Sequence, residues 1–180
     1  MSKKTRAFIA KKFEKELEIN QHKAQEGIHD LIIVLDHLKG NFNMGKIIRT
    51  CETFSIKEVH IIGTKFFDPT TAKGALKRVK IYWYDDIDES ISRLKELDFK
   101  LIAFDSKAKE YLGDRDLPKK SAFLFGHEEF GPLALRDGKI KEDDVLSLKI
   151  RQYGLTESLN VSVAASIAMY DYIRVYGEKC

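Results

Sequence analysis

The chain enters its last predicted helix through the stretch Ser158-Leu159-Asn160-Val161-Ser162-Val163-Ala164-Ala165. That helix should run from about Glu157 to Val175, with Ser158 and Asn160 in its first turn. Free backbone N–H groups in a first turn can bind an anion or a carbonyl, although Ser158 could equally be an ordinary cap. The following residues are small or apolar on nearly every side. Such a helix is buried in a core or in a subunit interface.

Upstream of this stretch, short runs rich in β-branched and aromatic residues alternate with helical patterns. Six runs are expected as buried strands, at residues 31–35, 59–63, 81–84, 101–104, 122–125 and 145–150. Helices are expected at residues 5–25, 44–54 and 88–97. The alternation predicts an α/β fold whose mostly parallel sheet has helices on both faces. Because such sheets bind ligands at the carboxyl ends of their strands, the loops after Leu35, Phe104, Phe125 and Ile150 are candidate site loops.

Two of these loops carry residues suited to a polar ligand. Asn43 is predicted to cap the second helix, as Asp88 caps the third, and Arg49 lies nearly two turns beyond Asn43. Arg49 is either a solvated surface residue or a guanidinium aimed at an anion such as phosphate. Gly126 and Gly131 bracket acidic residues, in either an ordinary turn or a close backbone approach to a ligand. The sequence lacks GxGxxG and GxxxxGK[ST], so it supports neither a dinucleotide fingerprint nor a P-loop.

The charge of the chain is concentrated near its start. The net charge is +3 over 180 residues, and residues 3–23 hold seven basic against three acidic side chains. Ile9, Phe13 and Leu17 form one apolar stripe through this segment. We expect a basic helical extension at residues 1–28, followed by one domain at residues 29–180. The helix either contacts an anionic partner or packs by its stripe and shows its lysines to water.

Several classes of protein fit poorly. The two cysteines, Cys51 and Cys180, form no CxxC pair and suit a reducing cytoplasm. An apolar run of the roughly 18 residues that a membrane span needs is missing, and no export signal is recognised. The five histidines lack metal-site spacing, so no metal is expected.

Three segments together resemble the motifs of the SpoU-type, TrmH-like RNA 2'-O-ribose methyltransferases of the SPOUT superfamily. Residues 43–50 are similar to the first motif, residues 124–131 to the second and residues 158–165 to the third, in the family's order. The resemblance covers about residues 30–175. The chain departs from the family at His127, where Asn is usual, and at Glu129, where Gly is usual. It also has Arg151-Gln152 after Ile150, where the family has Pro-Met.

The resemblance implies a C-terminal deep trefoil knot, S-adenosylmethionine as cofactor, and a homodimer formed through the last helix and the knot. Knots are rare enough that sequence physics alone does not predict one. By match to the family, the following residues would line the cofactor pocket: Phe104, Leu124, Gly126, Gly131, Ile150, Gln152 and Leu159.

The catalytic set implied by the same match is Arg49, Glu128, Ser158, Asn160 and, from the first motif, Asn43. Arg49 would act across the dimer, where it would orient an RNA phosphate and stabilise the developing alkoxide without losing its own proton. Glu128 and Asn160 would arrange the site, and Ser158 would position the ribose. Much of the rate should come from in-line alignment of donor and acceptor.

The expected activity is methylation of a ribose 2'-hydroxyl in RNA, with the basic first helix gripping RNA phosphates. The short chain favours tRNA over rRNA. Two alternatives stay open. An inactive SPOUT-like RNA-binding or regulatory protein is suggested by the altered second and third motifs, and a nucleotide-binding enzyme of the doubly wound class is weakened by the missing phosphate loops.

Overall fold

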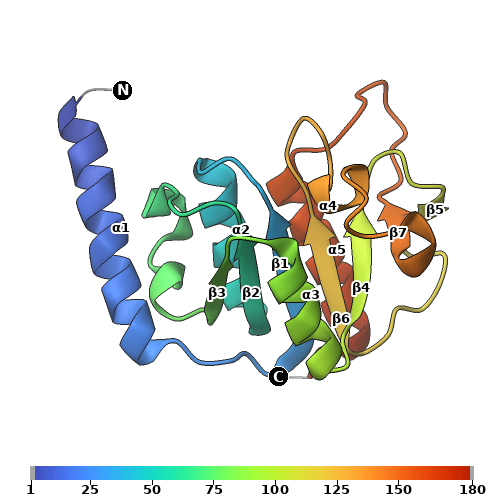
Figure 1. Ribbon diagram of the computed structural model, residues 1–180, viewed down its shortest axis with the longest axis horizontal. Coiled ribbons are helices and arrows are strands. Elements are labelled where there is room, and N and C mark those ends of the chain that lie inside the picture. The colour runs from blue at the N-terminus through green and yellow to red at the C-terminus, as the bar shows by residue number, and fades with distance from the viewer. Residues whose placement is uncertain (1–2, 179–180) are drawn as a thin grey trace.

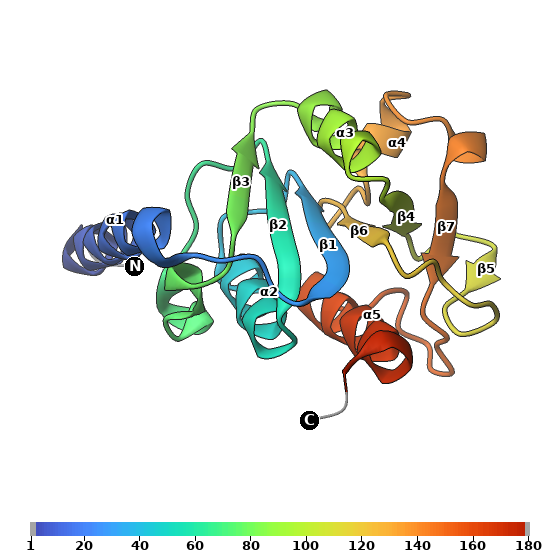
Figure 2. The same ribbon diagram turned by 90° about the horizontal axis from the view of Figure 1, so that it is seen from below.

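A seven-stranded sheet with helices against both faces forms the body of the protein (Figures 1 and 2). The computed structural model describes residues 3–178. Its strands are β1 His29–Asp36, β2 Ile56–Ile62, β3 Ile81–Tyr84, β4 Lys100–Phe104, β5 Glu110–Tyr111, β6 Ser121–Phe125 and β7 Leu146–Lys149. They lie in the order β3-β2-β1-β6-β4-β7-β5, and every neighbouring pair is parallel. The predicted parallel α/β class is therefore confirmed.

Within residues 3–178, five α-helices and three 3-10 turns accompany the sheet. The helices are α1 Lys3–Lys23, α2 Phe42–Thr53, α3 Ile87–Glu96, α4 Leu133–Arg136 and α5 Val161–Tyr176, and the turns are Pro69–Ala72, Ala75–Lys77 and Glu142–Asp144. Figure 2 shows α2 and α5 under one face, with α3 and α4 over the other. Neighbouring parallel strands need a crossover connection, most often a helix, because a tight turn cannot return the chain to a parallel start.

Alternation along β1 divides the core into two layers. Leu31, Ile33 and Leu35 belong to the cluster beneath the sheet that includes residues of α2 and α5. Ile32 and Val34 belong to the cluster on the α3 and α4 side. Because successive side chains of a strand point to opposite faces, a continuous apolar run marks a strand that is covered on both.

Helix α1 packs along the β3 edge of the sheet by the predicted apolar stripe (Figure 1). Ile9 and Phe13 are buried, and the Phe13 ring meets Trp83 edge to face at 6.0 Å between centroids. Asn20 is also buried, and its Nδ2 donates to the backbone oxygens of Leu76 at 2.5 Å and Val79 at 2.7 Å. These contacts fix the helix against the 3-10 turns while its basic side chains remain outside.

The predicted N-caps of the second and third helices were each wrong by two residues. Asn41, and not Asn43, caps α2, because its side chain accepts a hydrogen bond from the N–H of Asn43 at 3.0 Å. In the same way Asp86, and not Asp88, caps α3. Short Asn and Asp side chains reach the backbone N–H two residues onward, so the cap lies before the position that the apolar pattern suggests.

Helix α5 begins at Val161, later than predicted. Asn160 is its N-cap and Ser158 lies outside it, so the expectation that both sit in the first turn was wrong. The helix is also not buried on every side. Ala165 and Ala168 are in the core, whereas Val163, Ile167 and Tyr170 are exposed in the single chain.

Two further findings concern the sheet edge and the cysteines. Strand β5 was not expected, since a two-residue strand at an edge carries no periodicity of its own.

Cys51 is buried beside Met169, with 3.8 Å between the sulfur atoms, and loss of solvent raises the pKa of its thiol. Cys180 lies outside the described residues.

Candidate active site

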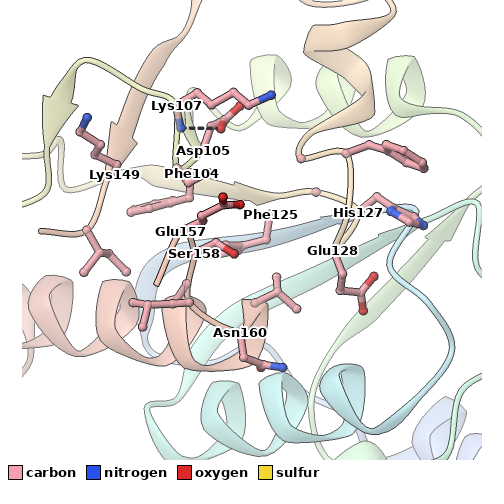
Figure 3. A pocket seen from close by; sticks show the side chains of 18 of the residues that line it. Phe104, Asp105, Lys107, Phe125, His127, Glu128, Lys149, Glu157, Ser158 and Asn160 are labelled. Atoms are coloured by element: carbon pink, nitrogen blue, oxygen red, sulfur yellow. Dashed lines mark hydrogen bonds between the residues drawn. The ribbon is translucent and has the colours of Figure 1, made fainter. Parts of the chain in front are cut away.

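A cavity of about 530 Å³ opens at the carboxyl ends of β4, β6 and β7 (Figure 3). Its volume lies within the range of about 300–1,000 Å³ that is usual for small-molecule sites. Three loops line it, at residues 104–107, 125–131 and 150–160, with Leu148, Lys149, Val161 and Ala164 completing the wall. Three of the four loops singled out from the sequence therefore meet at one place.

The loop after β6 is closed tightly on itself by its two glycines. The N–H of Gly131 donates to the backbone oxygen of His127 at 2.8 Å. A Cβ on Gly126 would lie 2.1 Å from the carbonyl carbon of Gly131, so a side chain there is excluded. Gly131 itself has φ +69°, a conformation that favours glycine. The two glycines thus give the loop one compact shape and expose its backbone to the cavity.

A chain of hydrogen bonds joins the three motif segments beside this cavity. Asn43 Nδ2 donates to Glu128 Oε1 at 3.1 Å, and Asn160 Nδ2 donates to Asn43 Oδ1 at 3.1 Å. The N–H of Lys39 donates to Glu128 Oε2 at 3.2 Å. Asn160 Oδ1 accepts from the N–H of Ser162 at 2.9 Å and so also caps α5. Residues far apart in sequence are held in one array, with half-buried Glu128 at its centre.

Glu129, which stands where the related family usually has glycine, pairs with Lys39 from the loop after β1. The hydrogen bond from the ammonium holds the pKa of Glu129 below its ordinary value and raises that of Lys39. Both side chains are exposed, so the pair ties two loops together at the edge of the cavity, where Glu129 is part of the lining, at little cost to solvation.

The cavity wall holds charges of both signs together with apolar surface. Figure 3 shows Asp105, Lys107, Lys149 and Glu157 around it. Asp105 Oδ1 accepts from the N–H of Lys107 at 2.8 Å, which folds the loop after β4. Sequence reasoning missed these four residues, although each follows or ends a strand or precedes the third motif. The strand-end rule alone could have found Asp105 and Lys107.

Arg151, another departure from the family, points away from the cavity. Its Nη2 contacts both carboxylate oxygens of Asp114, at 2.6 and 2.9 Å, and its guanidinium lies 4.2 Å from the centroid of Tyr111. The hydrogen bond to Asp114 raises the pKa of the guanidinium. This arrangement anchors the start of the 150–160 loop to the β5 edge.

Most of the predicted site residues lie at the cavity. Its lining includes the following predicted cofactor and catalytic positions: Phe104, Gly126, Gly131, Ile150, Gln152, Leu159, Glu128, Ser158 and Asn160. Asn43 does not line the cavity but joins the hydrogen-bonded array.

Two predicted residues lie elsewhere. Leu124 is fully buried in the core layer on the α3 side, because it alternates with Phe125, which does line the cavity. Arg49 is an exposed residue of α2, outside the cavity lining, and its guanidinium has no hydrogen bond or ion pair within residues 3–178.

Neither a metal centre nor a membrane span is found in the described part of the chain. Among residues 3–178, no group of three or more His, Cys, Asp or Glu side chains could hold a metal ion. Within the same range, no helix has both the length and the apolar character to cross a membrane.

Residues 30–170 match the sequence profile of the SpoU rRNA Methylase family. The chain belongs to this family. The match decides against an unrelated nucleotide-binding enzyme of the doubly wound class. It also agrees with the geometry, since the second and third SpoU-like segments line the cavity and the first is hydrogen-bonded to both through Asn43.

Relatives of this SpoU protein include enzymes named for two kinds of RNA. The tRNA (guanosine(18)-2'-O)-methyltransferase of Thermus thermophilus is 32% identical over 151 residues, covering 79% of this chain and 73% of that protein. The 23S rRNA (guanosine-2'-O-)-methyltransferase RlmB of Nitrosomonas europaea is 26% identical, covering 83% of this chain and 58% of that protein.

Solved structures share the fold. The TrmH/SpoU tRNA modifying enzyme of A. aeolicus superposes with a TM-score of 0.71 at 24% identity, covering 93% of this chain and 83% of that one. The SpoU methyltransferase AviRb from Streptomyces viridochromogenes, in complex with AdoMet, gives 0.70 at 20% identity, covering 84% and 58%. At these identities the likeness establishes the fold alone.

Proposed function

We propose that this SpoU family protein transfers a methyl group from S-adenosylmethionine to a ribose 2'-hydroxyl in RNA. The observation that carries the proposal is that two of the SpoU-like segments line one cavity, while the first is hydrogen-bonded through Asn43 to Glu128 and Asn160 of the other two. A tRNA substrate is favoured over rRNA, because the relative named for tRNA is more similar and is covered over more of its length.

The residues of the cavity fit S-adenosylmethionine. The molecule combines a flat apolar base with a ribose, a positive sulfonium, an ammonium and a carboxylate. Phe104, Ile150 and Ala164 offer apolar surface, while the exclusion of any side chain at Gly126 leaves room for close backbone contact. Charges of both signs line the same space, which suits a zwitterionic ligand with an added cationic centre.

When bound, the cofactor supplies an electrophilic methyl group on sulfur. The predicted holding residues are those of the lining, with Gly126, Gly131 and Leu159 presenting backbone and Gln152 offering an amide. Leu124 stands behind this wall and would support Phe125 from within the sheet. Of the departures from the family, Arg151 is held outside the cavity lining by Asp114. His127 and Glu129 are part of the lining, and Lys39 holds Glu129 at its edge.

The residues proposed to bind and orient the acceptor RNA are Arg49, Glu128, Ser158 and Asn160. A 2'-hydroxyl must lose its proton as it attacks, and a cation nearby stabilises the developing negative charge. The guanidinium of Arg49, unpaired in the described chain, is available to hold an RNA phosphate and that oxygen. Glu128 and Asn160 keep the wall rigid through Asn43, and Ser158 faces the cavity as a ribose contact (Figure 3).

A homodimer would bring Arg49 to a cavity. The exposed residues Val163, Ile167 and Tyr170 form an apolar stripe along α5, of the kind that a second subunit covers. This stripe is continuous with α2, since the Phe54 and Tyr170 rings are 6.4 Å apart. Arg49 lies on the exposed side of α2, so pairing through α5 would carry it toward the partner's cavity.

We further propose that the C-terminal segment threads a loop to form the deep trefoil knot. In support, Tyr172 of α5 donates to the backbone oxygen of Lys119 at 2.5 Å, and the Tyr176 hydroxyl donates to that of Leu117. The last helix thus contacts α2 through Ser166 and, further along, lies against the segment between β5 and β6.

RNA would also contact the basic extension at residues 1–28, ahead of the catalytic domain at residues 29–180. The side chains Lys3, Lys4, Arg6, Lys11, Lys15 and Lys23 are exposed along α1. Each phosphate contact makes binding fall with salt, so reversing two of these charges should reduce the salt dependence of RNA affinity. A protein with this role would act in the cytoplasm.

The decisive experiment is transfer of labelled methyl from S-adenosylmethionine to unmodified bulk tRNA and, separately, to rRNA. Arg49→Ala should abolish incorporation that maps to a ribose, while Lys46→Ala, an exposed cation of the same helix, should not. Incorporation absent from both RNA pools, with cofactor bound, would instead support the inactive RNA-binding protein.

Mixed dimers test the shared site. A dimer of one Arg49→Ala subunit and one Glu128→Ala subunit keeps one intact site if Arg49 acts across the interface. Such a dimer should retain about half the wild-type rate, whereas sites confined to one subunit predict none. The measurement is methyl transfer by purified, differently tagged heterodimers.

A further inference from the structure

An exposed aromatic group stands at the mouth of the cavity, in the same glycine-closed loop. The Phe130 ring stacks on His127, with centroids 4.9 Å apart and an interplanar angle of 22°. The side chain is nevertheless 56% exposed, although it lines the cavity. A large apolar ring that remains exposed beside a cofactor site indicates a surface that contacts the second substrate.

The loop holds this ring pair in place before any ligand binds. The backbone bond from Gly131 to His127 fixes the two ends of the segment that carries Phe130. The N–H of Glu129 donates to His127 Nδ1 at 3.2 Å, so the other ring nitrogen, Nε2, is left as a hydrogen-bond donor. Glu129 is in turn held by Lys39 from the neighbouring loop. The aromatic pair is therefore preorganised.

A guanidinium from α4 completes the feature. Arg136 lies 5.4 Å from the Phe130 centroid, and its Nε donates to Asp137 at 2.8 Å. The Arg136 side chain is itself about half exposed. Exposed aromatic faces combined with arginine are the usual means of binding a nucleobase and its phosphate, because bases stack on the ring and the cation meets the backbone.

We propose that Phe130, supported by His127 and flanked by Arg136, stacks against a base of the acceptor RNA at the entrance of the cavity. The inference rests on the proposed methyl transfer to RNA and adds a residue that positions the RNA. Phe130 lines the cavity and is exposed, two residues after Glu128, so its open face lies where an acceptor nucleotide would approach to bring its 2'-hydroxyl inside. The base contact thereby aligns the ribose without touching the transferred group.

The test compares Phe130→Ala and Phe130→Tyr in the full-length protein. The control is Glu96→Ala, which alters an exposed side chain at the end of α3, outside the cavity lining and the basic extension. Three quantities are measured: the Kd for S-adenosylmethionine, the Kd for unmodified bulk tRNA and rRNA, and the KM and kcat of methyl transfer. Size-exclusion chromatography reports the oligomeric state of each variant.

Phe130→Ala should raise the RNA Kd and KM about 5- to 150-fold, the factor that about 1–3 kcal/mol per stacked base represents. The Kd for S-adenosylmethionine should stay within about twofold, and Phe130→Tyr should restore RNA binding because it keeps the ring. Glu96→Ala should match wild type.

Three results would overturn the assignment: RNA affinity unchanged in Phe130→Ala, a parallel loss of cofactor affinity, or dissociation of the subunits. If the wild-type protein binds cofactor and RNA yet transfers no methyl group, only the proposed reaction is contradicted. The RNA affinities of the variants would still test whether Phe130 stacks on a base. A wild-type protein that binds neither RNA pool would overturn both.

Discussion

Two glutamates at the centre of polar arrays show how the same residue type serves different ends. Glu58 on β2 is fully buried and receives hydrogen bonds from His60 Nε2 at 2.8 Å and from Arg93 Nε and Nη2 at 2.8 and 2.7 Å. Glu128 is half-buried at the cavity and receives one amide bond from Asn43 and one backbone bond from Lys39. The first carboxylate is neutralised within the fold, and the second keeps its charge available to a ligand.

The surroundings of each glutamate follow from its position on the sheet. His60 Nδ1 pairs with Ser90 Oγ at 2.7 Å, and the Arg93 guanidinium packs 4.0 Å from the Tyr82 centroid, so the Glu58 array is complete on the α3 face. Glu128 lies beyond the end of β6, where the backbone leaves the sheet. A polar array whose members all have hydrogen-bond partners stabilises the fold. A polar array beside a cavity that can still accept hydrogen bonds is a candidate for catalysis or ligand binding.

Replacement of the buried glutamate should produce the largest effect. Glu58→Gln leaves the Arg93 charge without its partner in a poorly solvated place, so we expect the free energy of unfolding to fall by about 3–5 kcal/mol. Chemical denaturation at pH 7 measures this loss. Methyl transfer by the protein that remains folded should be unaffected. A lower kcat under conditions in which all of the variant is folded would contradict a purely structural role for Glu58.

The same pair predicts a pH dependence of stability. Burial alone would raise the pKa of Glu58, but the hydrogen bonds from Arg93 and His60 outweigh it and hold the pKa at about 2, below the ordinary 4.5. A depressed pKa stabilises the fold above about pH 4.5, and this stabilisation is lost as the pH falls toward 2. The stability difference between wild type and Glu58→Gln should therefore shrink across that interval, and a constant difference would refute it.

Replacement of the site glutamate should show the reverse pattern. Glu128→Gln keeps an acceptor for Asn43 but removes the charge, so we expect kcat to fall about 100-fold, as when one preorganised electrostatic contact is lost. The unfolding free energy should change by less than about 0.5 kcal/mol. Steady-state methyl transfer and chemical denaturation of the same preparation measure the two effects. A loss of stability comparable to that of Glu58→Gln would contradict the difference in role between the two glutamates.

Asn160 combines both roles and should show an intermediate effect. Asn160→Ala removes the cap of α5 and the bond to Asn43, so stability should fall by about 1 kcal/mol. Asn160→Asp keeps the cap oxygen but loses the donor to Asn43. We expect it to restore stability without restoring kcat, and recovery of both would show that capping is its whole contribution.

The exposed Lys39–Glu129 pair should contribute least. An exposed ion pair is well solvated and screened by salt, so Lys39→Ala should leave thermal stability nearly unchanged and reduce its small salt dependence. Thermal unfolding at low and high salt measures both. A drop in Tm as large as that of Asn160→Ala would mean that the pair supports the loop more than its exposure suggests.

Local patterns predicted the type and order of most elements. The apolar runs along β1, β3 and β6 read as covered strands, because β-branched and aromatic residues pack on both faces of a parallel sheet. The caps were misplaced by two residues, since a periodic pattern marks the apolar face of a helix and not the side chain that begins it. The two-residue β5 has no pattern to detect.

Part of the site was also predicted, because strand ends and short motifs can be recognised from local sequence. Strand ends and motif spacing located Gly126, Ile150 and Ser158 at the cavity. Leu124 and Phe125 are adjacent apolar residues of one strand, and nothing in their identities says which of the two faces the cavity.

The sequence by itself determined the parallel α/β class, the family and the loops that carry the site, because periodicity and short motifs are local properties of the chain. Only the tertiary structure decided that Asn43 meets Glu128 and Asn160, from 85 and 117 residues away. It also decided that Phe130 stands open at the cavity mouth. Such contacts depend on how crossovers stack the strands, and that arrangement is a property of the whole packed sheet.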